Sequence, residues 1–114
     1  MTITRTELDT RMSQSVVHGD TIYLAGQVGS GADVTAQTKD MLSEVDRLLA
    51  DAGSNKSQIL SATVWLADIA NIADMNAVWD AWIDPKNPPA RACVEARLAT
   101  PDYLVEVMIT AVKG

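Results

Sequence analysis

The chain has 114 residues, of which 47% are hydrophobic and 21% are charged, a composition that suits one folded domain over residues 1–114. Its formal net charge is −6 and its pI is about 4.5. Nucleic acids and anionic membrane surfaces bind proteins through clustered Lys and Arg, and this chain has no such cluster. Both kinds of partner are therefore excluded.

The counts of cysteine and histidine and the short apolar segments exclude further kinds of site and protein. The one cysteine, Cys93, cannot form an internal disulfide, and with the one histidine, His18, it cannot build a Cys/His zinc site. No apolar segment is long enough to cross a membrane, and the first residues lack the apolar core of a signal peptide. We therefore expect a cytoplasmic protein without a bound metal.

In chain order, the first predicted element is a β-hairpin over residues 16–28, where β-branched and aromatic residues flank a Gly-Asp turn. A helix is predicted next, over residues 34–52, with Asp33 as its N-cap and Gly53 directly after its end. Its apolar residues share one helical face: Val34, Met41, Leu42, Val45, Leu48, Leu49 and Ala52. Residues 59–67 then have the length and composition of a strand.

A second helix is predicted from Asn71 to Ile83, before a loop over residues 84–89 that contains three prolines. Strands over residues 91–98 and 103–112 follow, and we expect residues 99–102 to join them as a hairpin. The resulting order is ββαβαββ. It predicts an α+β fold with two helices on one face of a single sheet.

Alternation along the last three strands divides the sheet into two faces. One face is apolar and can lie under the helices. The other face mixes apolar and ionisable side chains: Trp65, Arg91, Cys93, Leu104, Glu106, Met108 and Val112. Such a face is too apolar for water and too polar for a dry core. We therefore expect an oligomer whose subunit interface contains a wet cleft.

Arg91 and Glu106 are the ionisable residues that could act on a substrate. The guanidinium of Arg91 can bind a carboxylate through two parallel hydrogen bonds, but a surface or interface ion pair is equally compatible with its position. Glu106 lies between two valines, where a carboxylate either pairs with a cation or has the raised pKa of an acid/base residue. If the last hairpin pairs Leu98 with Tyr103, Glu95 faces Glu106 and Arg91 lies about 13 Å away.

Cys93 lies two residues after Arg91, on the same predicted face. A thiolate nucleophile needs a neighbouring base, and His18 is placed at the first hairpin turn, where we expect it to be exposed. A small buried hydrophobic role for Cys93 is therefore favoured over nucleophilic catalysis.

The order of several short blocks resembles the Rid family (the YjgF type of enamine/imine deaminase). The matching blocks extend from Ser13 to Val112: Ser13–Val17, Tyr23–Gln27, Gln37-Thr38, Asp68 with Met75-Asn76, Pro89–Val94 and Val105–Val107. Residues 54–57 and 79–82 are most similar to the YoaB-like branch. Two positions depart from the family pattern, where Met12 replaces a tyrosine and Ala25 replaces the serine of an SGQ strand.

The resemblance implies a chorismate-mutase-like fold and a homotrimer with clefts between subunits. It also implies cofactor-free hydrolysis of enamine or imine acids of the 2-aminoacrylate type to 2-keto acids and ammonia. In this reading Arg91 holds the substrate carboxylate and Glu106 orients or activates the attacking water. Backbone groups near Gly26 and Cys93 bind the substrate, and Asn76 lies near the cleft.

The alternative is a non-catalytic trimer that binds small carboxylates, as a regulatory or chaperone-like module. A ribonuclease or translation inhibitor, also associated with this family, is disfavoured by the acidic charge balance and the missing basic groove.

Overall fold

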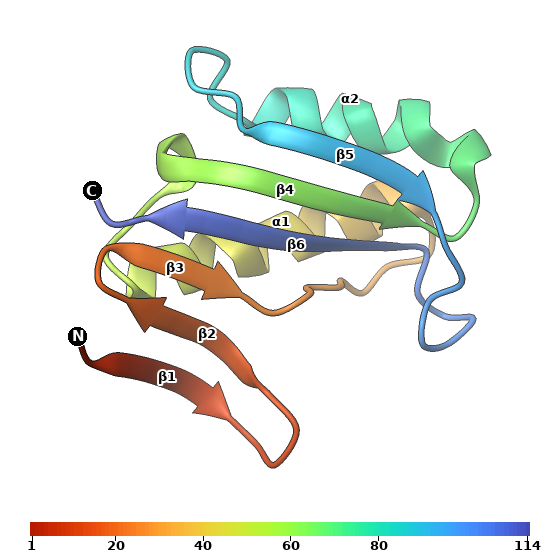
Figure 1. Cartoon of the computed structure of the whole chain (residues 1–114). Coiled ribbons are helices and arrows are strands. Elements are labelled where there is room, and N and C mark those ends of the chain that lie inside the picture. Colours follow the sequence, from red (N-terminus) through yellow and green to blue (C-terminus); the bar gives the residue numbers. More distant parts are fainter.

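The computed structural model describes residues 1–114 as a six-stranded sheet with both helices on one face (Figure 1). The sheet order is β1-β2-β3-β6-β4-β5. The elements are β1 (Ile3–Leu8), β2 (Ser13–His18), β3 (Thr21–Leu24), α1 (Val34–Asp51), β4 (Ile59–Leu66), α2 (Ile72–Trp82), β5 (Ala90–Glu95) and β6 (Val105–Val112). Two short 3₁₀ turns, η1 (Lys56–Gln58) and η2 (Ile69–Asn71), precede β4 and α2. The predicted α+β fold class is confirmed.

Helix α1 forms as its sequence predicts. The Asp33 carboxylate accepts a hydrogen bond from the backbone N–H of Ala36 at 2.8 Å, which caps the first turn. Gly53, with φ of 81°, follows the last turn in the left-handed conformation that glycine adopts at little cost. The apolar stripe packs on the sheet and is almost completely buried: Val34, Met41, Leu42, Val45, Leu48 and Leu49. Ala52, the last residue of the predicted stripe, is the C-cap and is only half-buried.

The sheet completes this core from its helix-covered face. Alternate residues of β4 and β6 are buried there: Ala62, Val64, Leu66, Val105, Val107 and Ile109. A bulge between Ile59 and Ser61 shifts the register of β4. Ile59 is therefore buried with the core, although it was expected on the opposite face, and Leu60 is exposed. For β4 and β6 the prediction of one apolar face under the helices is otherwise confirmed. For β5 it is wrong, because Val94 pairs with Trp65 on the open face.

The predicted hairpin between the last two strands is wrong. Strand β5 pairs in parallel with β4, and β6 pairs antiparallel with the other edge of β4, so β5 and β6 are not neighbours. A strand reached from its partner through a helix runs parallel to it, and α2 makes this crossover between β4 and β5. The Leu98–Tyr103 pairing and the Glu95–Glu106 contact do not form, since Glu95 pairs with Leu66.

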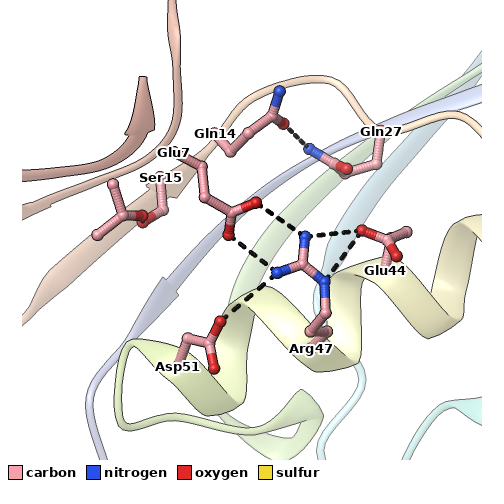
Figure 2. A network of polar contacts seen from close by, with 8 residues as sticks. Glu7, Gln14, Ser15, Gln27, Glu44, Arg47 and Asp51 are labelled. Carbon is pink, nitrogen blue, oxygen red and sulfur yellow. Dashed lines mark hydrogen bonds and ion pairs between the residues drawn. The ribbon is translucent and has the colours of Figure 1, made fainter. Parts of the chain in front are cut away.

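Strand β1 was not predicted, and it adds a third strand before α1. It pairs only with β2, and all six of its residues are exposed. Glu7 has a φ of 49°, which turns its carboxylate towards α1, where it accepts two hydrogen bonds from Arg47 at 2.9 and 3.1 Å (Figure 2). These bonds hold the pKa of Glu7 below its usual value. Arg47 also contacts Glu44 and Asp51, so one guanidinium connects the edge strand to the helix.

The open face of the sheet has no layer above it in the chain. The molecule measures 43 × 37 × 20 Å, and its short dimension holds only the sheet and the helices (Figure 1). Three large apolar side chains on this face, Tyr23, Val94 and Met108, are each close to half exposed. Neither α1 nor α2 has the length and hydropathy that a membrane-spanning helix requires.

Candidate functional site

Glu106 and Gly26 lie against each other on the open face. Glu106 is in the middle of β6 and pairs with Trp65 of β4. The segment after β3 returns to β6, where the backbones of Gln27 and Val107 exchange hydrogen bonds of 2.7 and 3.0 Å. A β-carbon on Gly26 would overlap the Glu106 carboxylate. Glycine at this position therefore allows the backbone to approach the acid directly.

A pair of glutamines fixes this segment. The side-chain amide of Gln27 donates a hydrogen bond to the side-chain oxygen of Gln14 at 2.8 Å (Figure 2). It also donates to the carbonyl of Ala25 at 3.2 Å. The backbone N–H of Ala25 donates to the carbonyl of Gln14 at 2.9 Å. Because Gln27 is buried, these bonds are shielded from water and hold Gly26 beside Glu106. The role of Gln14 was not predicted; its only signal in the sequence is its place in a family block.

Arg91 lies on β5, which is the edge strand of the sheet opposite β1. Its guanidinium carbon lies 5.1 Å from the centre of the Trp79 ring of α2. All three ion pairs of the structure belong to Arg47, and no carboxylate side chain accepts a hydrogen bond from Arg91. The guanidinium is therefore an exposed cation whose N–H groups are available to a carboxylate. No ion pair of Arg91 forms within the chain, and an ion pair across a subunit interface stays the alternative.

Cys93 follows on the same side of β5, where it packs against the core. Burial raises the pKa of its thiol, and the positive charge of Arg91 opposes this effect only in part. The thiol is therefore protonated at neutral pH, which fits the small hydrophobic role that the sequence favoured. His18 ends β2 and is exposed, as predicted.

Arg91 and Cys93 do not share a face with Glu106, and this corrects the sequence interpretation. Residues paired across strands lie on the same face, and Arg91 pairs with the buried Ala62 while Glu106 pairs with Trp65. The intervening strand β4 and three residues along the strands separate Arg91 from Glu106, so their Cα atoms lie about 14 Å apart. A site that uses both side chains cannot form within one chain.

Asn76 lies on α2, one turn before Trp79. Its side-chain oxygen is buried and has no hydrogen-bond partner. Residues three apart on a helix point to the same side, so Asn76 faces the same edge of the sheet as Trp79. An unpaired buried acceptor costs free energy, and because the chain itself encloses this oxygen, it does not face an open cleft.

The largest cavity of the single chain lies elsewhere. It has a volume of about 780 Å³ and opens beside the segment that connects β5 to β6, with Glu95, Arg97 and Tyr103 on its walls. None of the five predicted site residues lines it. No group of three His, Cys, Asp or Glu side chains is placed to hold a metal ion. The predicted site residues thus form two half-sites, Gly26 with Glu106 and Arg91 with Cys93, at separate places on the sheet.

The comparisons with known proteins identify the family. The model of the family described as Endoribonuclease L-PSP matches residues 2–113. The chain belongs to this family. The RutC family protein YoaB of Escherichia coli is 43% identical over 112 residues, which cover 97% of this chain and 98% of YoaB. A RutC family protein of Haemophilus ducreyi is 45% identical over 111 residues, with 96% and 95% covered.

A solved structure extends the match to the fold. The crystal structure of NMB1025 from Neisseria meningitidis, a member of the YjgF protein family, superposes with a TM-score of 0.98 at 45% identity. The match covers 100% of this chain and 97% of NMB1025. These findings confirm the resemblance to the Rid (YjgF) family, its YoaB-like branch and the chorismate-mutase-like α+β fold.

Proposed function

We propose that the chain assembles as a homotrimer and hydrolyses small enamine or imine acids to 2-keto acids and ammonia. Each active site would combine Arg91 and Cys93 of one protomer with Gly26 and Glu106 of the next. The observation that carries the proposal is the separation of these two half-sites on a chain that leaves one sheet face uncovered. A closed ring of identical contacts would supply the second half-site to every protomer.

In this arrangement each side chain has a defined part in the reaction. Arg91 binds the carboxylate of the imine acid through its two N–H edges. Glu106 accepts a proton from a water molecule as the water oxygen forms a bond to the imine carbon, whose C=N electrons move to nitrogen. Glu106 passes this proton to the nitrogen, which gives the neutral carbinolamine. It then takes the hydroxyl proton and delivers it to the nitrogen as the C=O bond forms and the C–N bond breaks, so ammonia leaves and Glu106 is a carboxylate again. The product is the 2-keto acid, and no redox step or cofactor is needed.

The physical requirements of this reaction are modest. An imine carbon is already electrophilic, so anchoring the acid and placing the water supply much of the catalysis. The amino group leaves readily as ammonia once its nitrogen is protonated. Neither step needs a nucleophilic thiol, in agreement with the protonated state of Cys93.

RNA cleavage, which the family's name suggests, is less well supported. The chain carries a net charge of −6, and the open face contributes the Glu106 carboxylate at the predicted site. Phosphate backbones are bound by clustered cations, and the two half-sites together contain a single arginine.

Mixing two inactive variants would test the proposal. Arg91→Ala should lose turnover and keto-acid binding, whereas Glu106→Gln should lose rate more than affinity. In a trimer assembled at random from equal amounts of the two, a site is intact when one variant supplies Arg91 and the other supplies Glu106. That is about one quarter of the sites. Co-refolding should therefore restore about a quarter of the wild-type formation of keto acid from enzymatically generated 2-aminoacrylate.

Controls separate the outcomes of this experiment. Co-refolding Glu106→Gln with the double variant Arg91→Ala/Glu106→Gln should restore nothing, because no chain then supplies Glu106. No recovery in the first mixture would show that both residues act from one chain or that neither acts. If wild-type protein binds pyruvate but does not speed hydrolysis over solvent, it is a carboxylate-binding module instead. If Arg91→Ala falls apart into monomers, Arg91 is an interface residue.

A further inference from the structure

Arg91 has one defined side-chain partner, and it is an aromatic ring. The guanidinium carbon lies 5.1 Å from the centre of the Trp79 ring, within the range of a cation–π contact. A carboxylate partner would occupy the N–H groups of the Arg91 guanidinium and neutralise its positive charge. An indole face attracts the cation and restricts its rotation but leaves those N–H groups available to a ligand.

Neighbouring side chains hold the Trp79 ring in place. Trp79 is only 5% exposed, and Trp82 packs against it edge to face with ring centres 5.3 Å apart. The indole N–H of Trp82 donates to the Asp46 carboxylate of α1 at 3.0 Å, and the Lys56 ammonium lies over the Trp82 ring at 5.5 Å. Two helices and η1 therefore fix the ring that contacts Arg91. A long, flexible side chain on an exposed edge strand gains a defined orientation from this support.

We infer that Trp79 is a positioning residue that orients Arg91 for the carboxylate of its ligand. The inference rests on the proposed role of Arg91 as the carboxylate anchor. It assigns to the Trp79–Trp82 pair a task beyond filling the core. An acid binds more tightly when the guanidinium is already oriented, because ordering the Arg91 side chain on binding costs conformational entropy and lowers the affinity.

The first test compares an acid with a neutral analogue. Calorimetry would measure the binding of pyruvate and of pyruvamide to wild-type protein, Trp79→Phe and Trp79→Leu. Trp79→Phe keeps an aromatic face and should bind pyruvate like the wild type. Trp79→Leu should bind pyruvate about tenfold more weakly, with little change for pyruvamide. In an Arg91→Ala background, where pyruvate binding is lost, Trp79→Leu should leave the affinity for pyruvamide unchanged, because the group that Trp79 orients is gone.

A purely structural role would weaken both ligands together and would persist in the Arg91→Ala background, which would overturn the inference. Equal pyruvate affinity in folded Trp79→Leu and wild-type protein would also overturn it. If the wild type bound no pyruvate, the proposed function of Arg91 would fail first, so the two failures are distinguishable.

A second measurement does not depend on whether Trp79→Leu folds. Wild-type protein labelled with 5-fluorotryptophan should give three fluorine resonances, and the Trp79 signal is the one missing from Trp79→Phe. Saturating pyruvate should shift this signal in the wild type but not in Arg91→Ala. An unchanged Trp79 signal at a pyruvate concentration that calorimetry shows to be saturating would overturn the inference.

Discussion

Replacing Gly26 by alanine should separate turnover from stability. The backbone of Gly26 is not in the left-handed region, so alanine can adopt it without strain. The new methyl group would overlap the nearer carboxylate oxygen of Glu106 and lie 3.1 Å from its Cδ atom. The carboxylate must then move by about 1 Å to restore normal contact. A displacement of this size at a reacting group can lower kcat about 100-fold.

Stability should change little, because the end of a flexible side chain can move aside. We expect the free energy of unfolding of Gly26→Ala to stay within about 1 kcal/mol of the wild type. Keto-acid formation from 2-aminoacrylate and denaturant unfolding would be measured on the same preparation. Pyruvate affinity should be largely retained, since Arg91 is not displaced.

Gly53→Ala is a matched control with the opposite outcome. Gly53 has a φ of 81° and no neighbour within 4 Å of the added carbon, so alanine there meets backbone strain without a steric clash. It should cost about 1 kcal/mol of stability and leave turnover unchanged. Full activity of Gly26→Ala would refute the view that Glu106 must hold its position. So would equal losses of activity in the two variants.

Three further predictions concern other groups. The Asn87 side chain and neighbouring donors hold the pKa of Asp84 at about 2, so its contribution to stability is complete above the unfolded pKa and is lost as pH falls towards 2. Asp84→Ala should therefore melt below the wild type at pH 7, and the two melting temperatures should converge near pH 2. Cys93→Ala should keep full turnover, and iodoacetamide should alkylate the native thiol much more slowly than the unfolded one, because burial raises its pKa. Glu7→Gln should speed amide exchange in the first strand, where Arg47 supplies the contact to the helix, while global unfolding changes little.

Local signals in the sequence were sufficient for the elements that build the core. The apolar stripe of α1, its Asp33 cap and Gly53 predicted the helix within a residue at either end. Strand β1 gave no comparable signal, because it buries neither face and is held by pairing with β2 and by Arg47. Hydrophobic patterning detects burial, so an edge strand exposed on both sides escapes it.

The sheet face on which Arg91 lies could not be predicted from the sequence. Alternation correctly separated Arg91 from Val94 within β5, but the face that each shares with other strands depends on register. The short segment after Leu98 suggested a hairpin, whereas the strand–helix–strand order of residues 59–98 favours parallel pairing. That second signal gives the pairing of β5 with β4 but not its register, and it is the register that places Arg91 beside Ala62, on the opposite face from Glu106.

A charge on the open face should abolish assembly and turnover together. Met108 is 48% exposed in the single chain and pairs with Thr63 near the centre of that face. Covering it with a neighbouring protomer would bury an apolar side chain, whereas Met108→Glu would bury an unpaired carboxylate at a cost of several kcal/mol. Light scattering after size exclusion should then give 12.2 kDa, the mass of one chain.

The matched substitution Ala81→Glu, on the exposed side of α2, should leave both mass and turnover unchanged. Dissociated Met108→Glu still contains Arg91 and Glu106 on a folded chain, so we expect its loss of activity to come from separating the two half-sites. A folded monomer that hydrolysed 2-aminoacrylate at the wild-type rate would instead require one chain to join residues about 14 Å apart on opposite faces. That result would exclude a site shared between protomers.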